Sequence, residues 1–160
     1  MDNSKKTKRK ILVTQALPYA NAPLHLGHIL EAVQTDIWTR FQNFNGNECL
    51  FFCADDTHGT PVMLKANEMG IKPEELISDV YKDHKSSYEL YGINFANFYS
   101  THSDENRKYS EYIYECAKNN NLISKANIEQ YYDEKEEMFL SDRFITVSYT
   151  HLTLPTRSYV

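Results

Sequence analysis

The sequence ILVTQALPYANAPLHLGHIL occupies residues 11–30 and contains a short apolar run, a loop rich in proline and asparagine, and the start of a helix. Residues 10–16 form a short segment that is mainly apolar and contains three β-branched side chains, as in a buried strand. Pro18 and Pro23 then favour a loop of fixed shape. From residue 26 apolar side chains recur at helical spacing up to residue 44, and the glycine at position 46 supplies a stop signal. The stretch therefore predicts a strand, a loop and a helix in that order.

The alternation of strands and helices continues along the chain. The sequence predicts a second buried strand over 48–54, helices over 61–70 and from 73 to about 92, a short strand over 97–100 and a helix over 104–119. This order is typical of an α/β fold with a parallel sheet. Between residues 122 and 144 the pattern changes to short extended pieces, which indicates the beginning of a different structural unit.

The composition is that of an ordinary soluble globular protein, with 41% hydrophobic and 24% charged residues. A net charge of −5 gives no overall attraction to nucleic acid, although a local basic patch on a larger protein would suffice. The apolar run behind the basic N-terminus is too short for a secretory signal, and no segment approaches membrane-spanning length, so we expect a cytoplasmic protein with no membrane partner. Cys49, Cys53 and Cys116 form no CxxC pair and are expected to be reduced, structural thiols.

The first polar cluster follows the first predicted strand, at the edge where open parallel sheets bind ligands. It consists of His25, Gly27 and His28, at the start of the predicted helix. A helix N-terminus favours phosphate, two imidazoles can donate hydrogen bonds to phosphoryl oxygens, and Gly27 leaves room for a flat ring. The alternative is that the histidines simply cap the helix.

The second polar cluster follows the second predicted strand and consists of Asp55, Asp56, His58 and Gly59. Adjacent carboxylates on an extended chain point in opposite directions. One can therefore face a pocket and hold a cationic group while the other orients the loop. Ordinary turn chemistry is the alternative for this cluster.

Two packing interpretations concern aromatic side chains. Trp38 is expected to pack in the core beside Ile37. The tyrosine-rich helix 104–119 is expected to present an amphipathic packing face, because no basic residues interleave its tyrosines as a base-stacking surface would require.

Four segments in order, ILVTQALPYANAPLHLGH, CADDTHGTPVMLKA, THSDEN and MFLSDRF, resemble the methionyl-tRNA synthetases, which are class I aminoacyl-tRNA synthetases. The resemblance extends over about residues 10–146. HLGH resembles the ATP-binding signature of class I, whereas LPYAN and ADDTHGTP resemble segments particular to the methionine enzymes. The resemblance implies the first half of a Rossmann-like, HIGH-type parallel-sheet nucleotide-binding domain, followed by the start of an inserted connective domain.

The resemblance also implies a reaction: L-methionine is activated by ATP, carried as its Mg²⁺ complex, to methionyl-adenylate, and the methionyl group passes to tRNA(Met). It implies that His25 and His28 are catalytic and bind ATP with Gly27. Leu17, Tyr19 and Asp56 correspond to methionine-binding residues, with Asp56 facing the substrate ammonium. The supporting residues that it implies are Asn21, Asp55, His58 and Gly59.

The family pattern is incomplete here. A lysine- and serine-rich KMSKS-type loop, zinc-knuckle cysteines and an anticodon-reading domain are not found, so we expect the 160-residue chain alone to be inactive and leave zinc open for a full-length parent. The expected regions are a basic tail over 1–10, the first half of the catalytic domain over 11–119, the start of the connective insertion over 120–146 and a non-native tail over 147–160.

Three alternatives remain at this point, and the oligomeric state is open under each. The chain can belong to another adenylate-forming nucleotidyltransferase of the HxGH type, which leaves ADDTHGTP unexplained. It can be a non-catalytic truncated module. It can also be a metal-dependent hydrolase, whose ligands would be His25, His28, Asp55, Asp56 and His58.

Overall fold

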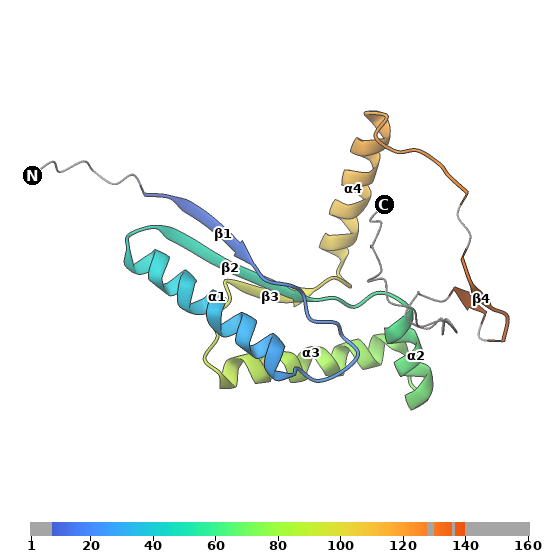
Figure 1. Ribbon diagram of the computed structural model, residues 1–160, viewed down its shortest axis with the longest axis horizontal. Helices are drawn as coiled ribbons and strands as arrows, with labels where there is room; N and C mark the ends of the chain where they lie inside the picture. The colour runs from blue at the N-terminus through green and yellow to red at the C-terminus, as the bar shows by residue number, and fades with distance from the viewer. Residues whose placement is uncertain (1–7, 128–129, 136, 140–160) are drawn as a thin grey trace, which may run out of the picture. The chain divides into compact units, whose positions relative to one another are not determined.

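The computed structural model describes residues 8–127, 130–135 and 137–139 (Figure 1). The chain divides into two compact units between Ser124 and Lys125, and each is described by itself. In the second unit, the two-residue strands β4 (Tyr132–Asp133) and β5 (Met138–Phe139) pair in antiparallel orientation. The tail expected over 147–160 lies outside the described residues, as do residues 1–7 of the expected basic tail.

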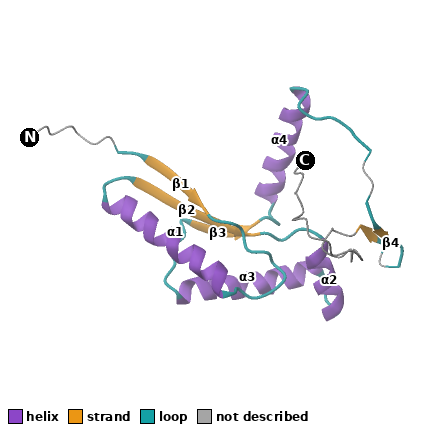
Figure 2. Ribbon diagram, viewed as in Figure 1, coloured by secondary structure: helices purple, strands orange, loops and turns teal. Residues whose placement is uncertain are grey.

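The first unit is built on a parallel three-stranded sheet in the order β1-β2-β3 (Figure 2). The strands are β1 (Lys10–Thr14), β2 (Glu48–Asp55) and β3 (Asn97–Ser100). Since all three strands run in one direction, their carboxyl ends meet at one edge of the sheet. The α/β class with a parallel sheet is therefore confirmed.

Four helices belong to the first unit, and their ends follow local signals. They are α1 (Leu26–Phe44), α2 (Thr60–Met69), α3 (Pro73–Leu90) and α4 (Asp104–Asn119). Proline stands in the first turn of both α2 and α3, where its missing N–H costs nothing. Gly70 ends α2 with a φ of 67°, and the Ser103 hydroxyl accepts a hydrogen bond from the Asn106 amide (3.2 Å) at the start of α4.

Helices α1 and α3 lie on one side of the sheet, and α4 projects from the other (Figure 2). The larger of two buried clusters among the described residues lies between the sheet and helices α1 and α3, and it consists of Ile29, Ala32, Phe51, Tyr88 and Ile93. A smaller cluster joins α2 to α3 and consists of Val62, Ala66 and Leu76. Helix α4 buries none of its residues, so the tyrosines expected to form a packing face make no core contact in the described part of the first unit.

The buried face of α1 differs from the one expected, and the core position expected for Trp38 is wrong. Trp38 and Ile37 are 44% and 61% exposed, while Asp36 is 6% exposed. The Asp36 carboxylate accepts a hydrogen bond from the Asn94 amide (3.1 Å) and pairs with Arg40. This polar contact helps to orient the Asp36 side of the helix inward, so the apolar stripe that includes Ile37 points outward.

None of the helices in the described part of the chain combines the length and apolarity needed to cross a bilayer. The three cysteines are free, as expected for structural thiols. Burial raises the pKa of the Cys53 thiol to about 12, which keeps it protonated.

Replacement of two isoleucines of α1 tests which face is buried. In the 160-residue chain, Ile29→Ala is expected to lower the free energy of unfolding by about 2–5 kcal/mol, because it leaves a cavity against Phe51 and Tyr88. Ile37→Ala, the matched control on the exposed face, is expected to change it by less than about 0.5 kcal/mol. Urea unfolding measures both, and equal losses would contradict the observed face.

Candidate functional site

The loop after β1 continues the pairing with β2 beyond the regular strands. The Ala20 amide donates to the Asp56 carbonyl, and the Asp56 amide donates to the Pro18 carbonyl, both at 2.8 Å. These bonds make Tyr19 and Asp56 an isolated parallel bridge. The LPYAN and ADD segments, which are 33 or more residues apart in the sequence, therefore lie side by side at the carboxyl edge of the sheet.

The two histidines of the HLGH sequence cap helix α1 with a reciprocal pair of hydrogen bonds. Nδ1 of His25 accepts from the amides of Gly27 (3.1 Å) and His28 (3.4 Å). In return, Nδ1 of His28 accepts from the His25 amide at 3.3 Å. The rings stack with centroids 3.7 Å apart. Capping, the alternative left open by the sequence, is thus present in the structure.

Capping through Nδ1 also fixes which nitrogen of each ring carries the proton. A ring whose Nδ1 accepts a hydrogen bond holds its proton on Nε2 in the neutral form. Burial lowers the pKa of His28, and repulsion from His25 and His84 lowers it further. In the described part of the chain neither Nε2 has a hydrogen-bond partner, so both Nε2–H groups are available as donors. The cap therefore closes the helix and leaves one unused N–H donor on each ring.

Gly27 lies against the imidazole ring of His25, two residues before it. A Cβ at this position would lie 2.9 Å from Cε1 and 3.0 Å from Nδ1 of His25, which is closer than such contacts allow. The flat ring that approaches Gly27 in this structure is the capping imidazole itself.

The twin aspartates have different surroundings. The Asp55 side chain is fully buried and its Oδ1 lies 2.7 Å from Nδ1 of His84, which is also fully buried. Nε2 of His84 lies 2.8 Å from the carbonyl oxygen of Ala22, in the loop before α1. Asp56 is half-buried beside Tyr19. The two side chains therefore lie in different surroundings, as expected for adjacent residues on an extended chain.

Tyr19 connects the loop to the segment after β2. Its hydroxyl donates to the His58 carbonyl, and its ring packs against the Val62–Ala66–Leu76 cluster. Gly59 has φ 113° and ψ 167°, a conformation that suits glycine alone, and a Cβ there would collide with the Tyr19 hydroxyl. Gly59 thereby allows the close approach of Tyr19.

The remaining predicted residues lie at the same edge with fewer contacts. Leu17 is 41% exposed. Asn21 is half-buried, and its amide donates to the Tyr19 carbonyl at 2.9 Å. His58 is exposed, with Nε2 3.4 Å from the carbonyl of Thr101.

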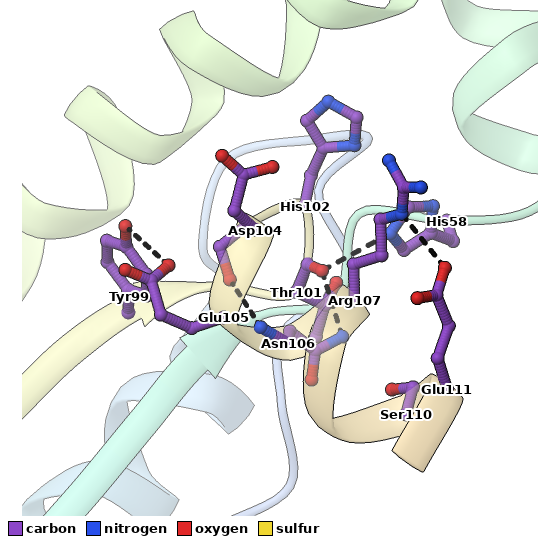
Figure 3. Close-up of a pocket in the computed structure, with 11 residues that line it drawn as sticks. His58, Tyr99, Thr101, His102, Asp104, Glu105, Asn106, Arg107, Ser110 and Glu111 are labelled. Atoms are coloured by element: carbon purple, nitrogen blue, oxygen red, sulfur yellow. Dashed lines mark hydrogen bonds and ion pairs between the residues drawn. The ribbon is translucent and has the colours of Figure 1, made fainter. Parts of the chain in front are cut away.

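His58 also lines a pocket of about 920 Å³ between the segment after β2 and the start of α4 (Figure 3). Figure 3 shows His102 and Arg107 in the same pocket, and acidic side chains of α4 beside them. The His58 and His102 ring centroids are 5.5 Å apart. Of the predicted site residues only His58 lines this pocket, so it lies beside the predicted site and does not coincide with it.

Sequence reasoning missed His84, which joins Asp55 to the loop before α1. Its signal was its position, four residues before Tyr88 and eight after Leu76, on the buried stripe of α3. A histidine at a position that helical periodicity places in the core needs buried partners. Identifying Asp55 and Ala22 as those partners requires the tertiary structure.

The chain matches the family model described as tRNA synthetases class I (M) over residues 11–155. The chain belongs to the class I tRNA synthetases (M). Among curated relatives, the methionine–tRNA ligase of Leptospira biflexa serovar Patoc (strain Patoc 1 / Ames) is 58% identical over 137 residues, which are 86% of this chain and 20% of that protein. The chain thus spans about one fifth of the length of the curated relatives that it matches.

Solved structures of synthetases share the fold of this class I chain. The Mycobacterium tuberculosis methionyl-tRNA synthetase in complex with methionyl-adenylate aligns with a TM-score of 0.75 at 24% identity, over 84% of this chain and 26% of that chain. The ternary complex of Agrobacterium radiobacter K84 agnB2 LeuRS with tRNA and LeuAMS aligns with a TM-score of 0.73 at 24% identity, over 85% and 18% of the two chains. At this identity the likeness concerns the fold.

Three of the five residues named as ligands in the metal-dependent hydrolase alternative use side-chain atoms in other contacts. Nδ1 of both His25 and His28 is used in the helix cap, and Asp55 bonds His84. Among the residues that the structure describes, no group of three or more His, Cys, Asp or Glu side chains is arranged to hold a metal ion.

Gly27→Ala tests the imidazole cap. Alanine normally stabilises a helix relative to glycine by up to about 1 kcal/mol. Here we expect a loss of about 0.5–2 kcal/mol, because the new methyl group displaces the His25 ring from the amides that it caps. Chemical unfolding measures the sign, and a stabilised variant would contradict the cap.

His28 and His84 are expected to have pKa values on opposite sides of the ordinary histidine pKa of 6.5, with His28 below it and His84 above it. Burial alone lowers the pKa of His84, but the hydrogen bonds to Asp55 and Ala22 and the nearby Asp55 and Asp83 charges outweigh burial and raise it. The contribution of His84 to stability is therefore complete below about pH 6.5 and is lost as the pH rises through its folded-state pKa. NMR titration of the ring carbons measures the order of the two pKa values, and a His28 pKa above that of His84 would contradict it.

Proposed function

We propose that this chain forms part of a methionine–tRNA ligase and contributes to its amino-acid and ATP sites. The reaction is the activation of L-methionine by ATP to methionyl-adenylate, with release of pyrophosphate, followed by transfer of the methionyl group to tRNA(Met). Family membership supports the reaction class, and the 58% identity to a methionine–tRNA ligase supports the amino acid. The single observation that carries the proposal is the Tyr19–Asp56 bridge, because it holds the loop that leads into His25 beside the second polar cluster at the carboxyl edge of the sheet.

On the ATP side, His25, Gly27 and His28 would hold the phosphates of ATP, supplied as its magnesium complex. The Nε2–H groups donate to phosphoryl oxygens, and the amino end of α1 adds its positive dipole. Donors fixed in place before the reaction stabilise charge that develops at the transferring phosphoryl group. Adenine would lie against the backbone near Gly27, beside the His25 ring.

On the methionine side, Asp56 would pair with the substrate ammonium, and Leu17 and Tyr19 would line the cavity for the thioether. Tyr19 is held by the His58 carbonyl on one side and by the apolar cluster of α2 and α3 on the other. A rigid aromatic wall suits a flexible thioether. Asn21, Asp55, His58 and Gly59 would support this arrangement through the loop contacts described above.

The rest of the proposal concerns the complete protein. Residues 11–119 would form the first half of the catalytic domain and residues 120–146 the start of a connective insertion, in a cytoplasmic enzyme. Zinc does not fit the cysteines of this chain, because Cys49 and Cys53 are buried on β2 and Cys116 lies on α4. No step of the proposed reaction in this chain depends on zinc.

An exchange assay tests the reaction. The complete protein is expected to catalyse ATP–pyrophosphate exchange with L-methionine, and with leucine or isoleucine at rates lower by about 10-fold or more, since an apolar pocket separates similar side chains by about 1–3 kcal/mol. Exchange that depends on another carboxylic substrate would favour a different adenylate-forming enzyme. The absence of exchange with any of them would favour a non-catalytic role.

A substitution at His28 separates capping from catalysis. His28→Asn retains a side-chain oxygen that can accept from the His25 amide but removes the Nε2–H donor. We expect the exchange rate of the complete protein to fall about 100-fold or more, while the Kd for methionine and the unfolding midpoint change little. Equal losses in exchange and in methionine binding would make His28 a structural cap only.

A further inference from the structure

We propose that His84 is a positioning residue for the methionine side of the site, because it joins the end of β2 to the loop before α1 through Asp55 and the Ala22 carbonyl. This inference rests on the proposed function. It adds a residue of α3 (Pro73–Leu90), far from both motifs in the sequence, to the residues on which methionine binding depends.

The bridge is short, buried and directional. The His84 and Asp55 side chains are both fully buried, 2.7 Å separates Nδ1 from Oδ1, and 2.8 Å separates Nε2 from the Ala22 oxygen. A carbonyl oxygen only accepts, so Nε2 of His84 carries a proton. The ring therefore donates to the loop from Nε2, and a proton lies between Nδ1 and Oδ1 of Asp55.

The loop held by this bridge carries the residues proposed to bind methionine. Leu17 and Tyr19 precede Ala22, and His25 follows it at the start of α1. On its β1 side the loop is held by the backbone bonds to Asp56. The His84 contact holds the second half of the loop, between the Tyr19–Asp56 bridge and the helix cap. Without it, the segment between these two points is less constrained.

Two other titratable groups, Asp83 and His28, interact with His84. Asp83 on α3 adds a favourable charge, and His28 on α1 is close enough for the two rings to repel each other. Within the described residues, Oδ2 of Asp55 is buried without a hydrogen-bond partner. Asp55 therefore depends on His84 for its side-chain hydrogen bond, and the loop depends on the same ring.

Two substitutions of His84 separate positioning from simple structural support. Glutamine extends its amide to the Nε2 position and can still donate to Ala22, but leaves the buried Asp55 without its partner. Asparagine places its amide near the Nδ1 position and can still donate to Asp55, but does not reach Ala22. A structural role predicts that the glutamine variant is the more impaired, because an unpaired buried carboxylate is the larger defect.

A positioning role predicts the opposite order for the KM for methionine, with the asparagine variant the more impaired. In the complete protein, His84→Asn is expected to raise the KM for methionine in ATP–pyrophosphate exchange about 10-fold or more, with kcat and the KM for ATP within about threefold of wild type. His84→Gln is expected to keep the KM for methionine within about threefold although its unfolding midpoint is lower. If the KM values instead follow the unfolding midpoints, the proposal is wrong.

Hydrogen–deuterium exchange of the loop separates this proposal from the proposed function. The amides of residues 19–22 are expected to exchange faster in His84→Asn than in His84→Gln, whether or not methionine is the substrate. If hydrogen–deuterium exchange of the loop is unchanged in His84→Asn, the positioning role alone is wrong. If the wild-type protein shows no methionine-dependent ATP–pyrophosphate exchange, the proposed function alone is wrong.

Asp55→Asn provides a third variant if the His84 variants do not fold. Asparagine can keep the contact with Nδ1 of His84 while removing the carboxylate charge, so the amides of residues 19–22 should stay as protected from hydrogen–deuterium exchange as in the wild-type protein. A KM for methionine raised 10-fold or more with a protected loop would show that the charge of Asp55 serves methionine directly, and would overturn the role of the bridge.

Discussion

The backbone hydrogen bonds between Asp56 and the Pro18–Ala20 segment are the contact on which the site depends. They extend the β1–β2 pairing by one bridge past the regular strands, at 2.8 Å in both directions. Backbone bonds of this kind are satisfied by any sequence that keeps the chain extended, so they fix position without limiting chemistry. The side chains that they bring together are then free to differ in role. The Tyr19 hydroxyl donates to a carbonyl, the Asp55 side chain is fully buried and Asp56 is half-buried.

Histidine serves this structure by using its two ring nitrogens for different partners. In His25 and His28, Nδ1 closes the helix and Nε2 is left as a donor. In His84, both nitrogens are used inside the protein, one toward Asp55 and one toward Ala22. The same residue type thus caps a helix at the surface and bridges a buried carboxylate to a loop. What distinguishes the cases is burial, because a buried ring cannot leave a polar nitrogen unpaired without a free-energy cost.

Polar contacts also decide how α1 lies on the sheet. Its apolar residues would have supported burial of a different face, yet Asp36 lies inside and Ile37 outside. The Asp36 carboxylate bonds the Asn94 amide, and Arg40 donates to the Gly92 carbonyl at 2.7 Å. These contacts hold the helix to the turn before β3. The outward apolar residues of α1 and the exposed tyrosines of α4 show that burial in the first unit is uneven, and that hydrophobic spacing alone is a weak guide to the buried face.

The sequence by itself determined the order and the ends of most elements, because their signals are local. Proline in the first turn of α2 and α3, Gly70 with a left-handed φ and the Ser103 cap each act within a few residues. The resemblance carried by HLGH and ADDTHGTP likewise placed the candidate residues of the site, since motifs are read along the chain. Only the tertiary structure decided which face of α1 is buried, that His25 and His28 cap each other, and that His84 meets Asp55 and Ala22. The contacts of His84 join residues that are far apart in the sequence, with separations of 29 positions to Asp55 and 62 positions to Ala22. Neither such contacts nor the orientation of a ring is encoded in local spacing.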